Sequence, residues 1–116
     1  MNTLMFPGLS ERDQRRVTNI RKLTGIDDII SAVSEVLGVD LSFVTTKIRT
    51  KEIAEARTIA IGLILQVDRQ ITLKSLGRIF GNRDHSTMSY NRDLYSDLYN
   101  RDKQFTAKVD AVLKIA

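Results

Sequence analysis

Apolar residues recur every three or four positions along most of this chain, which is the spacing of one face of an α-helix. The pattern predicts helices over residues 11–23, 26–37, 51–67, 72–80, 84–99 and 105–115, and a short helical turn that follows Asp40. Helices are predicted throughout, so we expect an all-α protein built as a small helical bundle.

Polar residues and glycines mark where these helices begin and end. Thr24-Gly25-Ile26-Asp27 resembles a capping box ahead of the helix over 26–37, and Gly38 should end that helix. Thr50 is the expected N-cap of the helix over 51–67, which should be the central helix of the core. The residues expected to face the core from these two helices and the last one are Ile26, Ile29, Ile30, Val33, Val36, Leu37, Ile53, Ala56, Ala60, Leu63, Ile64, Val67, Phe105, Val109, Val112, Leu113 and Ile115.

Residues 72–88 have the layout of two helices joined by a tight turn. Leu73, Leu76, Ile79 and Phe80 share one helical face, and Gly81 suits the left-handed conformation that ends such a helix. A second helix is predicted to start near Asp84. Its first turn carries a carboxylate, an imidazole and two hydroxyls, which can reach base edges and phosphates if the helix end enters the major groove of DNA.

Composition limits the classes of protein to consider. A chain of 116 residues that is 42% hydrophobic supports one compact domain. Cysteine is absent, which excludes disulfides, thiolate zinc sites and thiol nucleophiles, and no cofactor or metal is expected. The longest apolar stretch, residues 59–65, is too short to span a bilayer, and the first residues lack the layout of a secretory signal. We expect a soluble cytoplasmic protein.

Positive charge is concentrated in the region of the two-helix motif. Residues 47–92 hold nine Lys and Arg against four Asp and Glu, a balance of +5 within a total of +4, so the remainder carries −1. Such a local excess is the electrostatic footprint of a surface that binds phosphates. The alternative is an ordinary solvated face, which the charge alone does not exclude.

Two separated motifs resemble the carboxy-terminal DNA-binding domain of the bacterial replication initiator DnaA. The family signature "F-G-G-R-D-H-[ST]-T-V" follows a helix like "S-L-x-x-I-G-x-x-F", and this chain reads Ser75-Leu76-Gly77-Arg78-Ile79-Phe80-Gly81-Asn82-Arg83-Asp84-His85-Ser86-Thr87-Met88. Upstream, Lys47-Ile48-Arg49-Thr50-Lys51-Glu52-Ile53-Ala54-Glu55-Ala56-Arg57-Thr58-Ile59-Ala60 is similar to "S-x-x-R-x-x-x-[IV]-x-x-[AP]-R-[QH]-[IV]-A". The resemblance implies a helix-turn-helix domain of the DnaA domain IV and Trp repressor type over residues 26–116, preceded by a helical extension at 1–25.

The resemblance also implies which residues contact DNA. Asp84, His85 and Ser86 would read bases in the major groove, and Arg49 would enter the minor groove. The residues expected to contact the phosphate backbone are Lys47, Lys51, Arg57, Thr58, Leu73, Lys74, Arg83, Thr87 and Tyr90.

Several of these residues have plainer alternatives. Asp84 is suited to be a helix N-cap, and His85 to be a surface histidine. Tyr90 would equally suit packing beneath the last helical segment. The chain also departs from the family pattern, with Thr58 in place of glutamine or histidine, Ser86 in place of the commoner threonine, and a different sequence after Met88.

No enzyme is expected. The chain lacks a G-x-x-x-x-G-K-[ST] loop, so neither nucleotide binding nor an ATPase module is predicted. Asp84, His85 and Ser86 follow one another on a helix, where side chains diverge by about 100° per residue and cannot converge as a triad. The expected function is sequence-specific binding of double-stranded DNA at a DnaA-box-like site, acting passively in replication control or transcription regulation. Such a nucleoid-associated protein would compete with a full-length initiator. The alternative is a helical adaptor that binds a protein partner through the same basic face.

Overall fold

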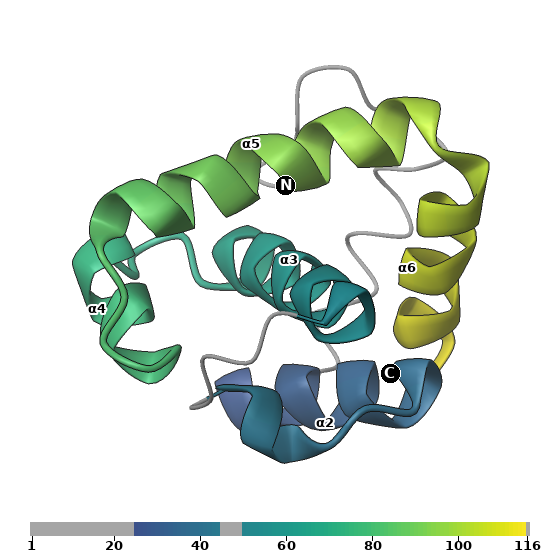
Figure 1. The fold of residues 1–116 in the computed structure, drawn as a ribbon, viewed down its shortest axis with the longest axis horizontal. Helices are drawn as coiled ribbons and strands as arrows, with labels where there is room; N and C mark the ends of the chain where they lie inside the picture. Colours follow the sequence, from purple (N-terminus) through teal and green to yellow (C-terminus); the bar gives the residue numbers. More distant parts are fainter. Residues whose placement is uncertain (1–24, 45–49, 116) are drawn as a thin grey trace.

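The computed structural model describes residues 25–44 and 50–115, and these form five α-helices and one short 3-10 helix, with no strand in the described part. The helix predicted over 11–23 and the extension at 1–25 lie outside the described residues, apart from Gly25. Figure 1 shows α3 (Lys51–Val67) in the middle, α5 (His85–Arg101) across the top, α2 (Ile26–Leu37) below it and α6 (Lys103–Ile115) to the right. The all-α prediction is confirmed.

Helix α2 spans the predicted residues, and Gly38 and Gly25 stand at its two ends. Gly38 is left-handed, with φ of 68°, and its N–H donates to the carbonyl of Ser34 at 2.9 Å, which closes the helix. At the other end the N-cap is Gly25, which has no side chain to accept a hydrogen bond. Thr24, on which the expected capping box depends, lies outside the described residues, and the N-cap position itself is taken by Gly25. The turn after Asp40 is the 3-10 helix η2 (Leu41–Val44).

Helix α3 forms the centre of the core. The hydroxyl of Thr50 accepts a hydrogen bond from the N–H of Ile53 at 3.3 Å, so the predicted N-cap is confirmed. Of the predicted inward residues, Ile53 and Val67 are only half-buried. The sequence predicted one buried face on α3, but the middle of the helix is buried on more than one face, because α2 and α5 pack on different sides of it. The buried residues of α3 are Ala56, Arg57, Thr58, Ile59, Ala60, Ile61, Gly62, Leu63, Ile64 and Gln66.

Helices α3 and α5 approach closely at Gly62. A Cβ atom at this glycine would lie 2.3 Å from the ring of Tyr95, so any larger side chain would push the two helices apart. Tyr95 is 6% exposed and packs edge-on against Phe105 of α6, with ring centroids 5.8 Å apart. Burial, with the nearby Tyr99 and Asp110, raises the pKa of Tyr95 far above its ordinary value.

Helices α4 (Leu73–Ile79) and α5 form the predicted two-helix motif. Thr72 caps α4, and its hydroxyl accepts from the N–H of Ser75 at 3.0 Å. The turn that follows uses two left-handed residues, Gly81 with φ of 87° and Asn82 with φ of 59°. Gly77 faces this turn so closely that a Cβ atom would lie 2.2 Å from the backbone carbonyl oxygen of Arg83. The backbone therefore folds back so that Arg83 lies against Gly77, where there is no room for a side chain.

Helix α6 packs back on the bundle, as expected. Its first turn is capped by Asp102, whose Oδ1 accepts from the N–H groups of Gln104 and Phe105 at 3.0 and 3.2 Å. Four of the five predicted core residues are buried, whereas Ile115 is 43% exposed, so its assignment to the core was wrong. Ile115 is the last residue of α6, at the exposed end of the helix.

Candidate nucleic-acid interface

The start of α5 presents polar side chains to solvent while its first turn is held from beneath. The side chains of Asp84 and His85 are 68% and 70% exposed, and Ser86 is exposed as well. Met88 is fully buried, beside Leu76 and Phe80 of the preceding helix in the same core. This arrangement fixes the helix end and leaves three consecutive polar side chains available to a ligand.

Asp84 occupies the N-cap position of α5, but its side chain does not cap the helix. No hydrogen bond joins its carboxylate to the first turn, and the backbone carbonyl accepts from Thr87 and Met88 instead. The carboxylate Oδ1 lies 3.1 Å from Nδ1 of His85. Because Nδ1 faces Asp84, Nε2 on the other side of the imidazole ring points away from this contact. The plainer interpretation of Asp84 as a capping residue describes its backbone and not its side chain.

Tyr90 lies one helical turn beyond Ser86 on the same side of α5. It is 65% exposed, the most exposed large apolar side chain of the described residues. The alternative in which Tyr90 packs beneath the last segment is therefore wrong. Its ring and hydroxyl extend the polar surface begun by Asp84 and Ser86 along the helix.

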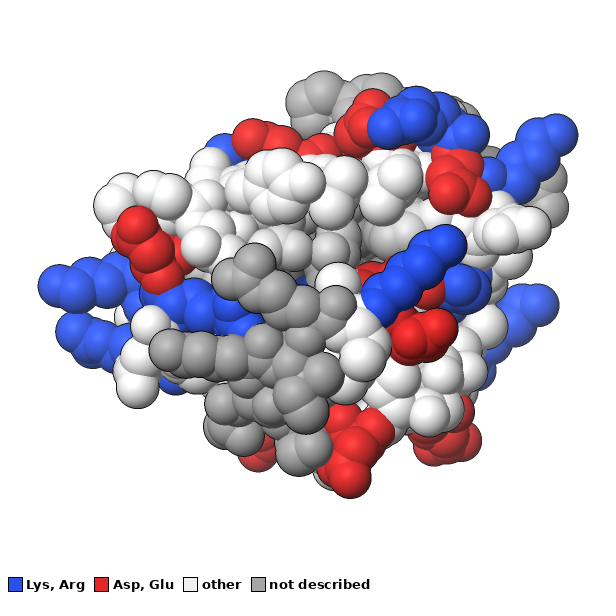
Figure 2. Space-filling model, viewed as in Figure 1, with Lys and Arg blue, Asp and Glu red and all other residues white. Residues whose placement is uncertain are grey.

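Basic side chains adjoin this surface. Lys74 and Arg78 of α4 are exposed, and Lys51 is exposed at the first position of α3. Figure 2 shows one group of Lys and Arg at the left end, where Figure 1 places α4, and others at the right and upper right, mixed with Asp and Glu; further Asp and Glu lie along the lower edge, where Figure 1 places α2. The basic side chains at the α4 end therefore lie apart from the acidic side chains along α2.

The other residues predicted to contact phosphates are less exposed to solvent or lie outside the described residues. Leu73, Arg83 and Thr87 are half-buried at the ends of the two motif helices. Lys47 and Arg49 lie outside the described residues. Arg57 and Thr58 are only 6% and 3% exposed, so these two bring little surface to a DNA backbone.

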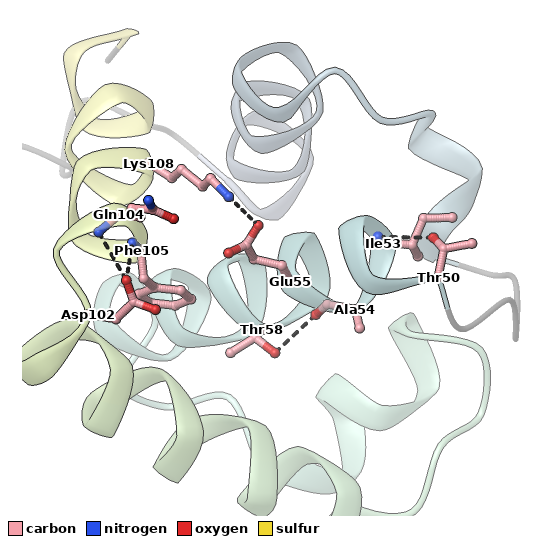
Figure 3. Close-up of polar contacts among 9 residues, drawn as sticks. All are labelled: Thr50, Ile53, Ala54, Glu55, Thr58, Asp102, Gln104, Phe105 and Lys108. Carbon is pink, nitrogen blue, oxygen red and sulfur yellow. Dashed lines mark hydrogen bonds and ion pairs between the residues drawn. The ribbon is translucent and has the colours of Figure 1, made fainter.

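The Thr58 hydroxyl is engaged inside the protein. It lies 3.0 Å from the carbonyl oxygen of Ala54 in its own helix and 2.8 Å from Oδ1 of Asn91 in α5. Figure 3 shows Thr58 on the side of α3 that faces α5, with Glu55 on the other side toward Lys108 of α6. A phosphate could meet the Thr58 hydroxyl only if these contacts were given up.

Two further polar residues on α5 were not predicted from the sequence. Arg92 is exposed, and its guanidinium donates to Ser89 Oγ at 3.0 Å and to Asp93 Oδ1 at 3.2 Å. Asn91 joins α5 to α3 through Thr58. The spacing of Ser89 and Arg92 by three residues is a signal that they share a helix face, whereas Asn91 carries no such local signal.

Other chemistries find little support in the described residues. Among residues 25–44 and 50–115, no group of three or more His, Asp or Glu side chains is arranged to hold a metal ion. No helix in the same ranges has the length and apolar character needed to cross a membrane.

Comparison with known proteins identifies one family and several relatives that are similar to this chain. The family model for the bacterial dnaA protein helix-turn-helix matches residues 26–93. The chain is similar to the chromosomal replication initiator protein DnaA of Campylobacter fetus, with 35% identity over 85 residues, or 73% of this chain and 19% of the relative. The protein of the same name in Bacteroides thetaiotaomicron is 32% identical over an alignment that covers 83% of this chain and 20% of that relative. The one in Flavobacterium psychrophilum is 29% identical over 87% of this chain and 21% of that relative. The chain thus spans about a fifth of the length of these curated relatives.

Proposed function

Because the chain belongs to the family of bacterial DnaA helix-turn-helix domains, we propose that it binds double-stranded DNA sequence-specifically with the first turn of α5 in the major groove. The observation that carries this proposal is the exposure of Asp84, His85 and Ser86 on a helix end anchored by the buried Met88. A rigidly held helix end with exposed polar side chains is what base recognition requires.

The three side chains have complementary chemistry for base edges. The Asp84 carboxylate accepts a hydrogen bond from a cytosine amino group, and the Ser86 hydroxyl can donate or accept. His85 presents its second ring nitrogen beyond the contact with Asp84, which orients the ring. Arg49, outside the described residues, is proposed to read a narrow minor groove at the adjoining A·T-rich end of the site, where the negative potential is concentrated.

Backbone contacts are proposed to hold the domain in register. Lys51, Lys74 and Arg83 supply positive charge around the motif, and Lys47, which lies outside the described residues, is proposed to add to it. Thr87 and Tyr90 supply hydroxyl donors on α5, and the start of α4 at Leu73 supplies backbone N–H groups. Arg57 lies beside this surface with 6% of its area exposed, so its share of the phosphate contacts should be the smaller.

The site that we propose is short, asymmetric and similar to a DnaA box, since the relatives are named as chromosomal replication initiators. The described helices offer one recognition helix, which matches one domain on one site. The proposed role is occupancy of that site in replication control or transcription regulation at the nucleoid in the cytoplasm. A full-length initiator that reads the same sequence would be a competitor.

Selection of bound sequences from a random duplex pool tests this proposal without presuming the site. The purified chain should enrich a single short motif that lacks two-fold symmetry. The selected duplex should then bind at least about tenfold more tightly than a scrambled one at the same salt concentration. The helical adaptor for a protein partner would be favoured if the selection enriched no motif and the chain either captured no DNA or captured it to an extent that does not depend on salt concentration.

A further inference from the structure

Helices α3 and α5 are joined by a polar contact between Thr58 and Asn91. The Thr58 hydroxyl has a single proton and two acceptors within reach: Oδ1 of Asn91 at 2.8 Å, across 33 residues of sequence, and the carbonyl oxygen of Ala54 in its own helix at 3.0 Å. The nearer acceptor is Asn91, and the contact with it joins the two helices. Thr58 is 3% exposed and Asn91 is half-buried, so water competes little for this bond. A directional contact in such surroundings constrains the two helices more than apolar packing does.

The orientation of the Asn91 amide is set by a second hydrogen bond. Its Nδ2 donates to the backbone carbonyl of Thr87 at 2.8 Å. If the amide were reversed, Oδ1 would face that carbonyl and two acceptors would oppose each other. The amide oxygen therefore points to Thr58, and the three residues form a chain of contacts from α3 to the first turn of α5.

This chain ends beside the side chains proposed to read bases. Thr87 follows Ser86 directly, and its carbonyl belongs to the turn that presents His85 and Ser86. One turn farther along both helices, Gly62 and the ring of Tyr95 set how closely α3 and α5 approach. The ring contact fixes distance, whereas the Thr58–Asn91 bond fixes the rotation and the axial position of α5.

We infer that Thr58 is a positioning residue, which acts through Asn91 to set how the first turn of α5 is presented to the bases. Thr58 then governs preference between DNA sequences and not the strength of backbone contacts. This inference rests on the proposed function. It assigns to Thr58 a role different from the phosphate contact expected from the sequence, and it gives Asn91 a role where none was expected.

The test compares the wild type with Thr58→Val, Asn91→Ala and the double variant, on the selected duplex and on a scrambled duplex. Each single change should lower the ratio of the two affinities by about threefold to tenfold. The double variant should lower the ratio no further than the more damaging single change, because both substitutions remove the same contact. Thr58→Ser keeps the hydroxyl and should keep the ratio. The slope of log K against log salt should not change, since no cation is removed.

Glu55→Gln is the matched control, since Glu55 also lies on α3 and contacts another helix, with Lys108 Nζ at 2.6 Å from its carboxylate (Figure 3). It should leave the affinity ratio unchanged. Asn91→Ala is the variant expected to fold most readily, because the Thr58 hydroxyl can still donate to the Ala54 carbonyl at 3.0 Å and is not left buried without an acceptor. Circular dichroism verifies the helices of each variant.

The outcomes separate the inference from the proposed function. Equal losses of affinity on both duplexes would make Thr58 a backbone contact and overturn the inference. An affinity ratio that is unchanged in Thr58→Val, Asn91→Ala and the double variant would also overturn it. A wild-type chain that shows no preference for any duplex would overturn the proposed function, and the inference with it.

Discussion

At the scale of single residues, the first turn of α5 divides between side chains that face solvent and side chains that hold the helix. Asp84→Ala or His85→Ala should cost about 1–3 kcal/mol on the selected duplex and little on a scrambled one, because base-edge contacts form only with the right sequence. Lys51→Ala should weaken both duplexes alike, since a phosphate contact carries no sequence information. Fluorescence anisotropy on both duplexes at one salt concentration measures these losses.

The folding of each variant is the control for this comparison. The Asp84 side chain makes no capping hydrogen bond, so its removal should leave the unfolding temperature nearly unchanged. Equal losses on both duplexes for all three variants would contradict the division between base reading and backbone holding.

Tyr95 gives the protein a dependence on alkaline pH. Burial raises the pKa of Tyr95 in the folded state far above its ordinary value, so the unfolded state releases this proton first as the pH rises. The free energy of unfolding should therefore fall as the pH climbs above about 10, the ordinary pKa of tyrosine, and be unaffected by this group below that value. Urea unfolding at a series of pH values measures the effect.

Tyr95→Phe removes the ionisable group and keeps the ring that packs on Gly62 and Phe105. Its stability should fall less steeply with pH above 10 than that of the wild type. Identical slopes for the two proteins would show that Tyr95 does not govern the alkaline loss.

Residue-scale predictions succeeded where a local pattern carries the information. A polar trio three residues after the helix-ending Gly81 predicts polar side chains at a helix start, and Asp84, His85 and Ser86 lie exposed there. The burial of Thr58 was not foreseen, because its partner Asn91 is 33 residues away. No periodicity links the two positions, so only the packing of α3 against α5 reveals the contact.

At the scale of elements, helix ends were predictable where one residue type dominates the local energetics. The N-cap Thr50 and the left-handed Gly38 fixed the bounds expected for α3 and α2. The capping box expected at Thr24 involves a residue outside the described ranges, and the N-cap of α2 is Gly25. The observed start places both Asp27 and Asp28 in the first turn, where carboxylates interact favourably with the helix dipole.

The α4–α5 motif depends on the absence of a side chain at Gly77. Gly77→Ala should destabilise the fold by about 1–3 kcal/mol, because its Cβ would collide with the backbone of Arg83 and the turn cannot yield as a flexible side chain can. Displacement of the turn should also weaken binding to the selected duplex. Thermal unfolding and anisotropy measure the two effects.

Gly25→Ala is the matched control for this substitution, since nothing lies within 4 Å of a Cβ at Gly25. It should change stability by less than about 1 kcal/mol. A loss at Gly77 no larger than that at Gly25 would show that the turn adapts.

At the scale of the whole molecule, the division of charge predicts how binding responds to salt. A positive excess in the motif region and an acidic α2 favour one orientation toward DNA. If roughly five phosphates are neutralised, log K should fall against log salt with a slope of about −4 to −5. Titration of the selected duplex with potassium chloride gives the slope, and a value near zero would contradict an interface that neutralises phosphates.

The last prediction concerns what binding does to the duplex. The chain contains no G-x-x-x-x-G-K-[ST] loop to cradle a triphosphate, so it should occupy its site without ATP-dependent opening of the strands. A bound domain still fills the groove and should exclude any other protein that reads the same bases. A supercoiled plasmid carrying the selected site, incubated with the chain with and without ATP, should show protection of that site and no unpaired bases by permanganate. ATP-dependent reactivity of thymines beside the site would show that this chain drives strand opening itself.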